Sequence, residues 1–259
     1  MGARGTALPP PLVVTSGLIA AALAVVAFLY ACVGHAGASG YIAVLALAGW
    51  PAEQIKPLAL LLNTLVASVG CWNFLRAGHL PWRRLWPVYV LAIPAAFLGG
   101  WLALPALWFR RLVGVVLLLS AWRLGRRLQD PPLLQEPRPA VLMAAGGGLG
   151  LLAGLTGTGG GVFLTPLLLL CRWCSTRQAA AVSVLFILVN SIAGLAGLAW
   201  AGAWPAGAFA RPDLLLWLAV VVLAGGLGSR LGSRHWPVAW IRRALAAVLL
   251  LASWKLLGL

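Results

Sequence analysis

Long apolar stretches, separated by charged residues, proline or glycine, dominate the chain from residue 12 onward. Several of them, such as 55–75 and 178–200, contain about the 20 residues that an α-helix needs to cross a bilayer. Two others, 41–49 and 161–171, are much shorter. The pattern predicts an all-α polytopic membrane protein. The expected segments are 12–33, 41–49, 55–75, 84–104, 106–123, 139–154, 161–171, 178–200, 213–229 and 238–257.

Two glycine-rich runs, beginning at Gly34 and Gly154, each precede one of the short segments. Glycine is unfavourable inside a helix and is needed where the backbone unwinds or approaches another element closely. In membrane proteins, paired interruptions at corresponding places in two halves indicate a transport site. The glycines that correspond at a constant separation of 120 residues are Gly34, Gly37 and Gly40 with Gly154, Gly157 and Gly160.

A second match indicates two repeats of five segments each. Asn63-Thr64 corresponds to Asn190-Ser191 at a separation of 127, because the second half carries seven extra residues near its CRWCSTR stretch. The polar, proline-containing stretch between the halves is typical of a linker. We therefore expect an N-terminal transmembrane repeat over 1–123, a cytoplasmic linker over 124–138 and a C-terminal transmembrane repeat over 139–259.

Composition supports a membrane protein and argues against an enzyme. The 259 residues are 62% hydrophobic and 9% charged, whereas soluble domains have about 25% charged residues. Ten segments leave no room for a catalytic domain outside the bilayer. The net charge of +15 comes from basic residues scattered singly or in pairs between apolar segments, which favours contact with lipid and not with nucleic acid.

The basic residues also predict how the chain is threaded. If the short segments 41–49 and 161–171 cross the membrane, thirteen basic residues lie on the linker side and six on the other. If the short segments do not cross, the split is ten against nine. The positive-inside rule therefore favours ten crossings, an inverted repeat, and both termini outside.

The paired glycine breaks predict an anion site. A helix that starts in the bilayer directs unpaired N–H groups and the positive end of its dipole toward the break, and such ends attract anions. The alternatives are that the glycines only allow close helix packing and that the asparagines only bond neighbouring helices. The residues expected to bind the anion are Gly37, Ser39, Gly40, Asn63, Gly157, Thr158, Gly160, Gly161 and Asn190.

Titratable groups are scarce near the breaks. His35 is the histidine beside the first break, where it could handle a proton or simply pack. The four acidic residues all lie at segment ends or in the linker, so no carboxylate relay is expected. We expect no metal and no cofactor, because the C-x-x-C pair at Cys171 and Cys174 has no second pair and no nearby histidine.

A different class of function is suggested by GASG at 37–40, which resembles the nucleophile motif of rhomboid intramembrane serine proteases. Ser39 would be the nucleophile and would need a histidine base. The equivalent of Ser39 in the second half is Gly159, so the repeat does not preserve the nucleophile. An anion channel is a further alternative.

The second run, GLTGTGGG over 154–161 followed by Pro166, resembles the TauE/SafE family of sulfite and organosulfonate exporters. The run from Gly34 is a weaker copy, with His35, Ser39 and Tyr41 as departures and Ala46 at the position of Pro166. The resemblance implies a multi-pass permease of the bacterial inner membrane, often a homodimer, that moves small sulfur-containing or carboxylate anions outward. We therefore expect export of a small anion by alternating access.

Overall fold

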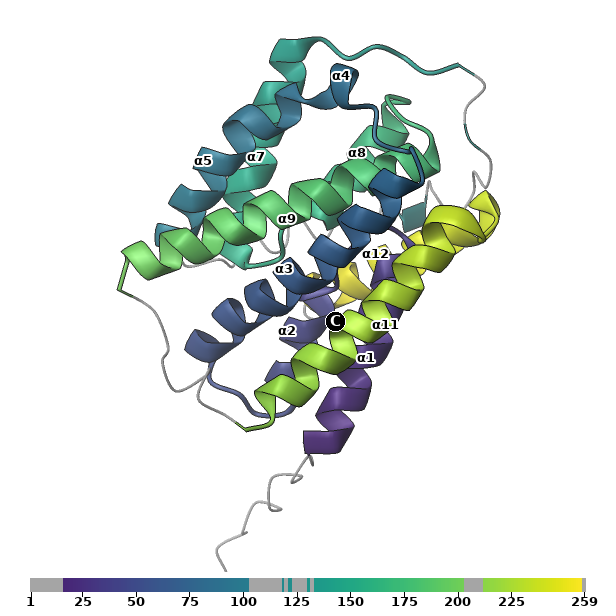
Figure 1. Ribbon diagram of the computed structural model, residues 1–259. Coiled ribbons are helices and arrows are strands. Elements are labelled where there is room, and N and C mark those ends of the chain that lie inside the picture. The colour runs from purple at the N-terminus through teal and green to yellow at the C-terminus, as the bar shows by residue number, and fades with distance from the viewer. Residues whose placement is uncertain are drawn as a thin grey trace, which may run out of the picture.

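The computed structural model describes residues 16–102, 118, 121–122, 130, 133–202 and 212–257. The regular structure of these residues is entirely helical (Figure 1). Four helices, α3, α7, α9 and α11, are long and apolar enough to cross a membrane. Most of the segment predicted at 106–123 and most of the linker lie outside the described residues. The helices are α1 (Ser16–Cys32), α2 (Ala38–Leu47), α3 (Ala52–Arg76), α4 (Trp82–Leu85), α5 (Pro87–Trp101), α7 (Pro139–Thr156), α8 (Gly161–Leu170), α9 (Thr176–Trp200), α11 (Leu214–Arg234) and α12 (Val238–Leu257).

The segment predicted at 84–104 is divided in the structure. A single turn, α4, precedes α5, and Pro87 occupies the first position of α5. Proline has no N–H and fits the first turn of a helix, but it cannot continue a hydrogen-bonded helix from the preceding turn. Pro87 therefore sets the start of α5.

The long helices form two groups of opposite direction. In one group, α1 and α11 run parallel, since Gly228 contacts Phe28 and Gly232 contacts Cys32. Helix α3 runs parallel to α11, because Asn73 bonds to Ser229 and Val66 lies against Gly225.

The second group contains α5, α7 and α9. Helices α5 and α7 run parallel, as Val88 contacts Gly146 and Ala96 contacts Gly154. Helix α9 runs in the same direction as α5. Near the start of both helices, Tyr89 bonds to the carbonyl of Val182, and toward their ends, Gly197 packs against the backbone of Phe97.

The two groups meet where α3 and α9 cross in opposite directions (Figure 1). Along this contact Leu60 lies at Gly194 and Gly70 at Val184. Each group therefore combines the first and fourth segments of opposite halves: α1 of the first half packs on α11, and α7 of the second half packs on α5.

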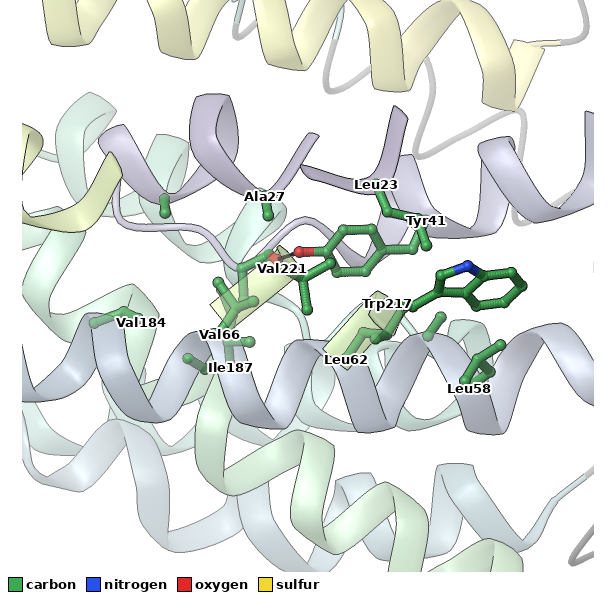
Figure 2. Close-up of a cluster of buried hydrophobic side chains, with 14 of the residues drawn as sticks. Leu23, Ala27, Tyr41, Leu58, Leu62, Val66, Val184, Ile187, Trp217 and Val221 are labelled. Atoms are coloured by element: carbon green, nitrogen blue, oxygen red, sulfur yellow. Dashed lines mark hydrogen bonds between the residues drawn. The ribbon is translucent and has the colours of Figure 1, made fainter. Parts of the chain in front are cut away.

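A cluster of buried hydrophobic side chains fills the space between α1, α2, α3, α9 and α11 (Figure 2). Tyr41 and Trp217 are the largest fully buried side chains. The Tyr41 hydroxyl donates to the carbonyl of Ala36 over 2.6 Å, so the cluster also fixes the backbone of the first break. Large apolar side chains on the outer surfaces, such as Trp200 and Leu215, are exposed in the monomer, as expected for residues that face lipid.

One end of the protein gathers basic side chains and the loops that carry them. Arg84 Nη2 donates to the carbonyls of Gln135 and Trp173, over 2.6 and 2.5 Å. Arg242 forms an ion pair with Asp130 over 2.9 Å. These contacts tie α4 and the loops before α7 and α9 to the start of α12, at the end where α3 and α11 finish.

Candidate functional site

Each glycine-rich run separates a long helix from a short one. In the first, Gly37 has φ 100° and immediately precedes α2. In the second, Gly157, Gly159 and Gly160 all have positive φ values between α7 and α8. The short segments predicted at 41–49 and 161–171 therefore exist as the ten-residue helices α2 and α8.

Gly159 shows why this backbone requires glycine. Its φ is 72°, and a Cβ there would collide with Asn63 Nδ2 and lie 3.0 Å from Ser191 Oγ. A side chain would thus be both strained and obstructed. The absence of a side chain lets the second break pass directly against polar groups of α3 and α9.

The two breaks converge on one small cavity. Its volume, counted as the space open to the centre of a water molecule, is about 10 Å³, roughly the room that one water needs. Residues from the first turns of α2 and of α8 both line it, so the two helix N-termini lie beside the same space. The lining residues are Tyr30, His35, Ala36, Gly37, Ala38, Ser39, Thr158, Val162 and Ile187.

Asn63 joins the two halves beside this cavity. Its side-chain oxygen accepts a hydrogen bond from the N–H of Ala38, the first residue of α2, over 3.2 Å. Its Nδ2 donates to Ser191 Oγ on α9 over 3.0 Å. Asn63 therefore occupies one of the donors that the start of α2 would otherwise present.

Asn190, the equivalent residue of the second half, has a different environment. Its side chain is fully buried, yet neither its Oδ1 nor its Nδ2 has a hydrogen-bond partner. It lies one helical turn after Phe186, which contacts Gly160 in the second break, so it shares the face of α9 that covers this break. The described residues also provide no acceptor for the N–H groups of Gly161 and Val162.

His35 lies in the first break but bonds to the second half. Its Nε2 is 2.8 Å from Thr165 Oγ1 on α8, and the Thr165 hydroxyl donates to Ser183 Oγ on α9 over 2.7 Å. The ring is 2% exposed, and its Nδ1 has no hydrogen-bond partner.

The other expected site residues divide into three groups. Ser39 and Thr158 reach the cavity, where Ser39 Oγ lies 3.1 Å from the Tyr30 hydroxyl and Thr158 bonds to Thr156. Three glycines lie against other side chains, since a Cβ would strike Val26 at Gly40, Lys56 at Gly157 and Phe186 at Gly160. Gly161 begins α8 and lies against Ile187 and His35.

Sequence reasoning missed several residues of this site. Thr165 and Ser183 complete the bonding of His35, and Tyr30 bonds to Ser39. The sequence could have indicated these residues, because polar side chains inside apolar segments are costly unless they have partners. The apolar lining residues Val162 and Ile187 carried no such signal.

The protease geometry is not formed by Ser39 and its neighbouring histidine. His35 directs Nε2 to Thr165, and its Nδ1 bonds to nothing, so neither ring nitrogen bonds to Ser39. His79 bonds to the carbonyl of Ser233 at the basic end. A serine nucleophile needs a base within hydrogen-bond reach.

The C-x-x-C pair lies in the loop between α8 and α9, away from the cavity. Both thiols are free, with Cys174 buried and Cys171 partly exposed. Burial raises the pKa of Cys174 to about 12, although Arg84 opposes the shift. Such a thiol is protonated at neutral pH and a poor nucleophile. No cluster of three metal-binding side chains occurs among the described residues.

Comparison with known proteins identifies the family of the chain. The chain is 38% identical over 245 residues, 92% of its own length and 97% of the relative's, to the "Probable membrane transporter protein y4hK" of Sinorhizobium fredii. No solved structure matches the chain. Residues 18–256 match the family described as "Sulfite exporter TauE/SafE". The protein is therefore a multi-pass membrane transporter that belongs to the TauE/SafE sulfite exporter family.

Proposed function

We propose that this transporter exports a small anion, such as sulfite, a short organosulfonate or a related carboxylate, by alternating access. The observation that carries the proposal is the convergence of the N-termini of α2 and α8 on one cavity. Two helix N-termini give a positive potential and backbone donors without a buried arginine. The side chains of Ser39 and Thr158 add polar hydroxyl groups to the cavity lining from both breaks.

Electrostatics favour an anion over a cation at this place. No aspartate or glutamate lines the cavity in the described part of the chain. A cation there would face two positive helix ends with no carboxylate to balance it. A membrane potential that is negative inside drives each net negative charge outward by about 2.3 kcal/mol per 100 mV, so export of a species that keeps a net negative charge needs no sodium relay.

The relation between the halves supports alternating access. Every equivalent pair of long helices described here runs in opposite directions, with α3 against α9 as the direct contact. We interpret this as an inverted repeat whose halves cover 1–123 and 139–259, joined by the linker at 124–138. Inverted repeats move by rocking one group of helices against the other around a central site. The cavity has room for about one water, so we assign this conformation to a closed state.

Efflux from proteoliposomes tests the proposal. Vesicles loaded with labelled sulfite, sulfoacetate or thiosulfate should release at least one of these anions when an outward-driving potential is imposed, and release should saturate with concentration. Steady conductance without saturation would indicate a channel. No movement of any anion by a folded preparation would overturn the proposal.

Two serine variants compare a residue of the cavity wall with a residue on the protein surface. Ser39→Ala should slow efflux several-fold, because it removes a hydroxyl from the cavity wall. Ser68→Ala is the matched control, since Ser68 is exposed and bonds only to the carbonyl of Thr64 on its own helix. Peptide cleavage by the wild type that Ser39→Ala abolishes, with efflux unaffected, would favour the protease alternative.

The cellular setting is also part of the proposal. We place the protein in the inner membrane of a bacterium, in line with the bacterial origin of its relative. A homodimer is the expected assembly, and the exposed apolar side chains of the outer helices are available for lipid and for a second copy.

A further inference from the structure

His35 is held at one nitrogen and left open at the other. The Thr165 hydroxyl has one hydrogen, which it donates to Ser183 Oγ. The hydroxyl oxygen must then accept from His35, so the hydrogen-bond network places the proton of the neutral ring on Nε2. Nδ1 is therefore a bare lone pair, buried and without a partner, on a residue that lines the cavity.

Burying such a lone pair costs free energy unless a proton or a hydrogen-bond donor binds to it. An unsatisfied buried acceptor loses its hydration without replacement. Water can fill the cavity only to about one molecule. Protonation at Nδ1 would convert the acceptor into a charged donor, on a residue that lines the cavity beside the starts of α2 and α8.

Among the described residues, the contacts of His35 include no counter-ion for a charged ring. Its titratable neighbours are phenols: Tyr30 on α1, whose ring centroid is 6.4 Å away, and Tyr41 on α2, which donates to Ala36. Thr165 on α8 and Ser183 on α9 are neutral. The charged groups of the surrounding helices have other contacts: Lys56 lies against Gly157, Arg177 bonds to Trp236 and Arg242 to Asp130.

We infer that His35 takes up a proton on Nδ1 when the anion binds, so that the closed site holds an anion and a proton together. The inference rests on the proposed function and adds a binding partner, the proton, to the same site. The proton comes from the solvent or from the acid form of the ligand, forms an N–H bond at Nδ1, and leaves when the anion leaves. Each ligand then stabilises the other by the same free energy.

Anion binding is therefore expected to weaken as pH rises. Thiosulfate and methanesulfonate are suitable probes, because their own charge stays constant between about pH 5.5 and 8.5. Binding to the purified full-length protein can be measured by ligand-dependent thermal stabilisation. The midpoint is the pH at which His35 of the anion-free protein is half protonated. Above it, affinity should fall by up to about tenfold per pH unit, the limit for one proton taken up per anion. Affinity that is equal at both ends of this range would overturn the inference.

Histidine variants show which residue binds the proton. His35→Gln should bind the anions with the same affinity across the range, whereas His79→Gln and His235→Gln should keep the wild-type dependence. Retention of the dependence by a folded His35→Gln would also overturn the inference.

Thr165→Val provides a second test if His35→Gln does not fold. It keeps the histidine but removes the acceptor of Nε2–H, so the midpoint should fall by about 0.5–1 pH unit; an unchanged midpoint would contradict the inference. The proposed function fails separately, when no anion binds or moves at any pH. Binding and efflux without pH dependence would defeat the proton coupling alone.

Discussion

Asn63 and Asn190 occupy equivalent sequence positions but differ in their bonds. Asn63 accepts from Ala38 N–H and donates to Ser191 Oγ, so it holds the start of α2 and ties α3 to α9. Asn190 is equally buried and bonds to no protein group. The first N–H groups of α8 also have no acceptor within the described part of the chain. An unpaired buried amide near such groups is the arrangement expected of a side chain that binds a ligand.

The two asparagines should therefore respond differently to substitution. Asn63→Ala should destabilise the protein by about 2–4 kcal/mol, because two buried hydrogen bonds are lost and their partners stay buried. Asn190→Leu should be neutral or stabilising by about 1 kcal/mol, because it removes an unsatisfied polar group at similar size. Thermal unfolding in detergent would measure both.

Transport gives the complementary readout for this pair. Asn190→Leu should reduce anion efflux at least several-fold while the protein remains folded. A stable Asn190→Leu protein with wild-type efflux would assign Asn190 to packing alone.

Helices α5 and α7 are held together by rows of small residues. Gly146, Gly150 and Gly154 of α7 lie one turn apart and face the backbone of Val88, Ala92 and Ala96 of α5. A Cβ at any of the three glycines would strike a carbonyl oxygen of α5. Such close approach supplies the van der Waals contacts that hold helices together in a bilayer, where burial of apolar surface gives no advantage.

Two nearby glycines of α7, one packed against α5 and one exposed, provide a matched test of this packing. Gly146→Ala should destabilise the protein by about 1–3 kcal/mol, because the added methyl group must push α5 away. Gly148→Ala adds the same methyl group to the exposed face, where nothing lies within 4 Å, and should stabilise the helix by about 0.5–1 kcal/mol. If Gly146→Ala and Gly148→Ala changed the thermal stability equally, the backbones of α5 and α7 would not be in close contact at Gly146.

Considered together, the helix directions and the charges define two unlike ends. The end where α3 and α11 finish carries Arg84, Arg177 and Arg242, with their bonds to the surrounding loops. Lys56 and Glu53 lie near the start of α3, at the other end. The positive-inside rule predicts that the arginine-rich end faces the cytoplasm.

Cysteine labelling in intact cells tests this orientation. In a Cys171→Ser background, which removes the partly exposed native thiol, Glu53→Cys should react with a membrane-impermeant maleimide from outside. Leu133→Cys, at a side chain that is 79% exposed, should react only after permeabilisation. The reverse pattern would invert the assigned topology, and with it the assignment of 124–138 to the cytoplasm.

The hydrophobic pattern was sufficient to predict the fold class and most helices. Long apolar segments must be helical in a bilayer, because every backbone group needs an internal partner, and α3, α9 and α11 lie where 55–75, 178–200 and 213–229 predicted helices. The glycine runs were also readable, since a break before a short helix leaves a local signature. The segment at 84–104 was predicted as one helix because proline interrupts hydrogen bonding without interrupting hydrophobicity.

The membrane class, the family pattern and the position of the two breaks are thus local properties, written in composition and spacing. The partners of the site residues depend on tertiary structure. Asn63 forms two hydrogen bonds whereas Asn190, at the equivalent position, forms none. His35 bonds to Thr165, which lies 130 residues away in sequence. A hydrogen bond depends on distances of a few tenths of an ångström between elements, and the packing of α3 against α9 sets those distances, which no local pattern of residues encodes.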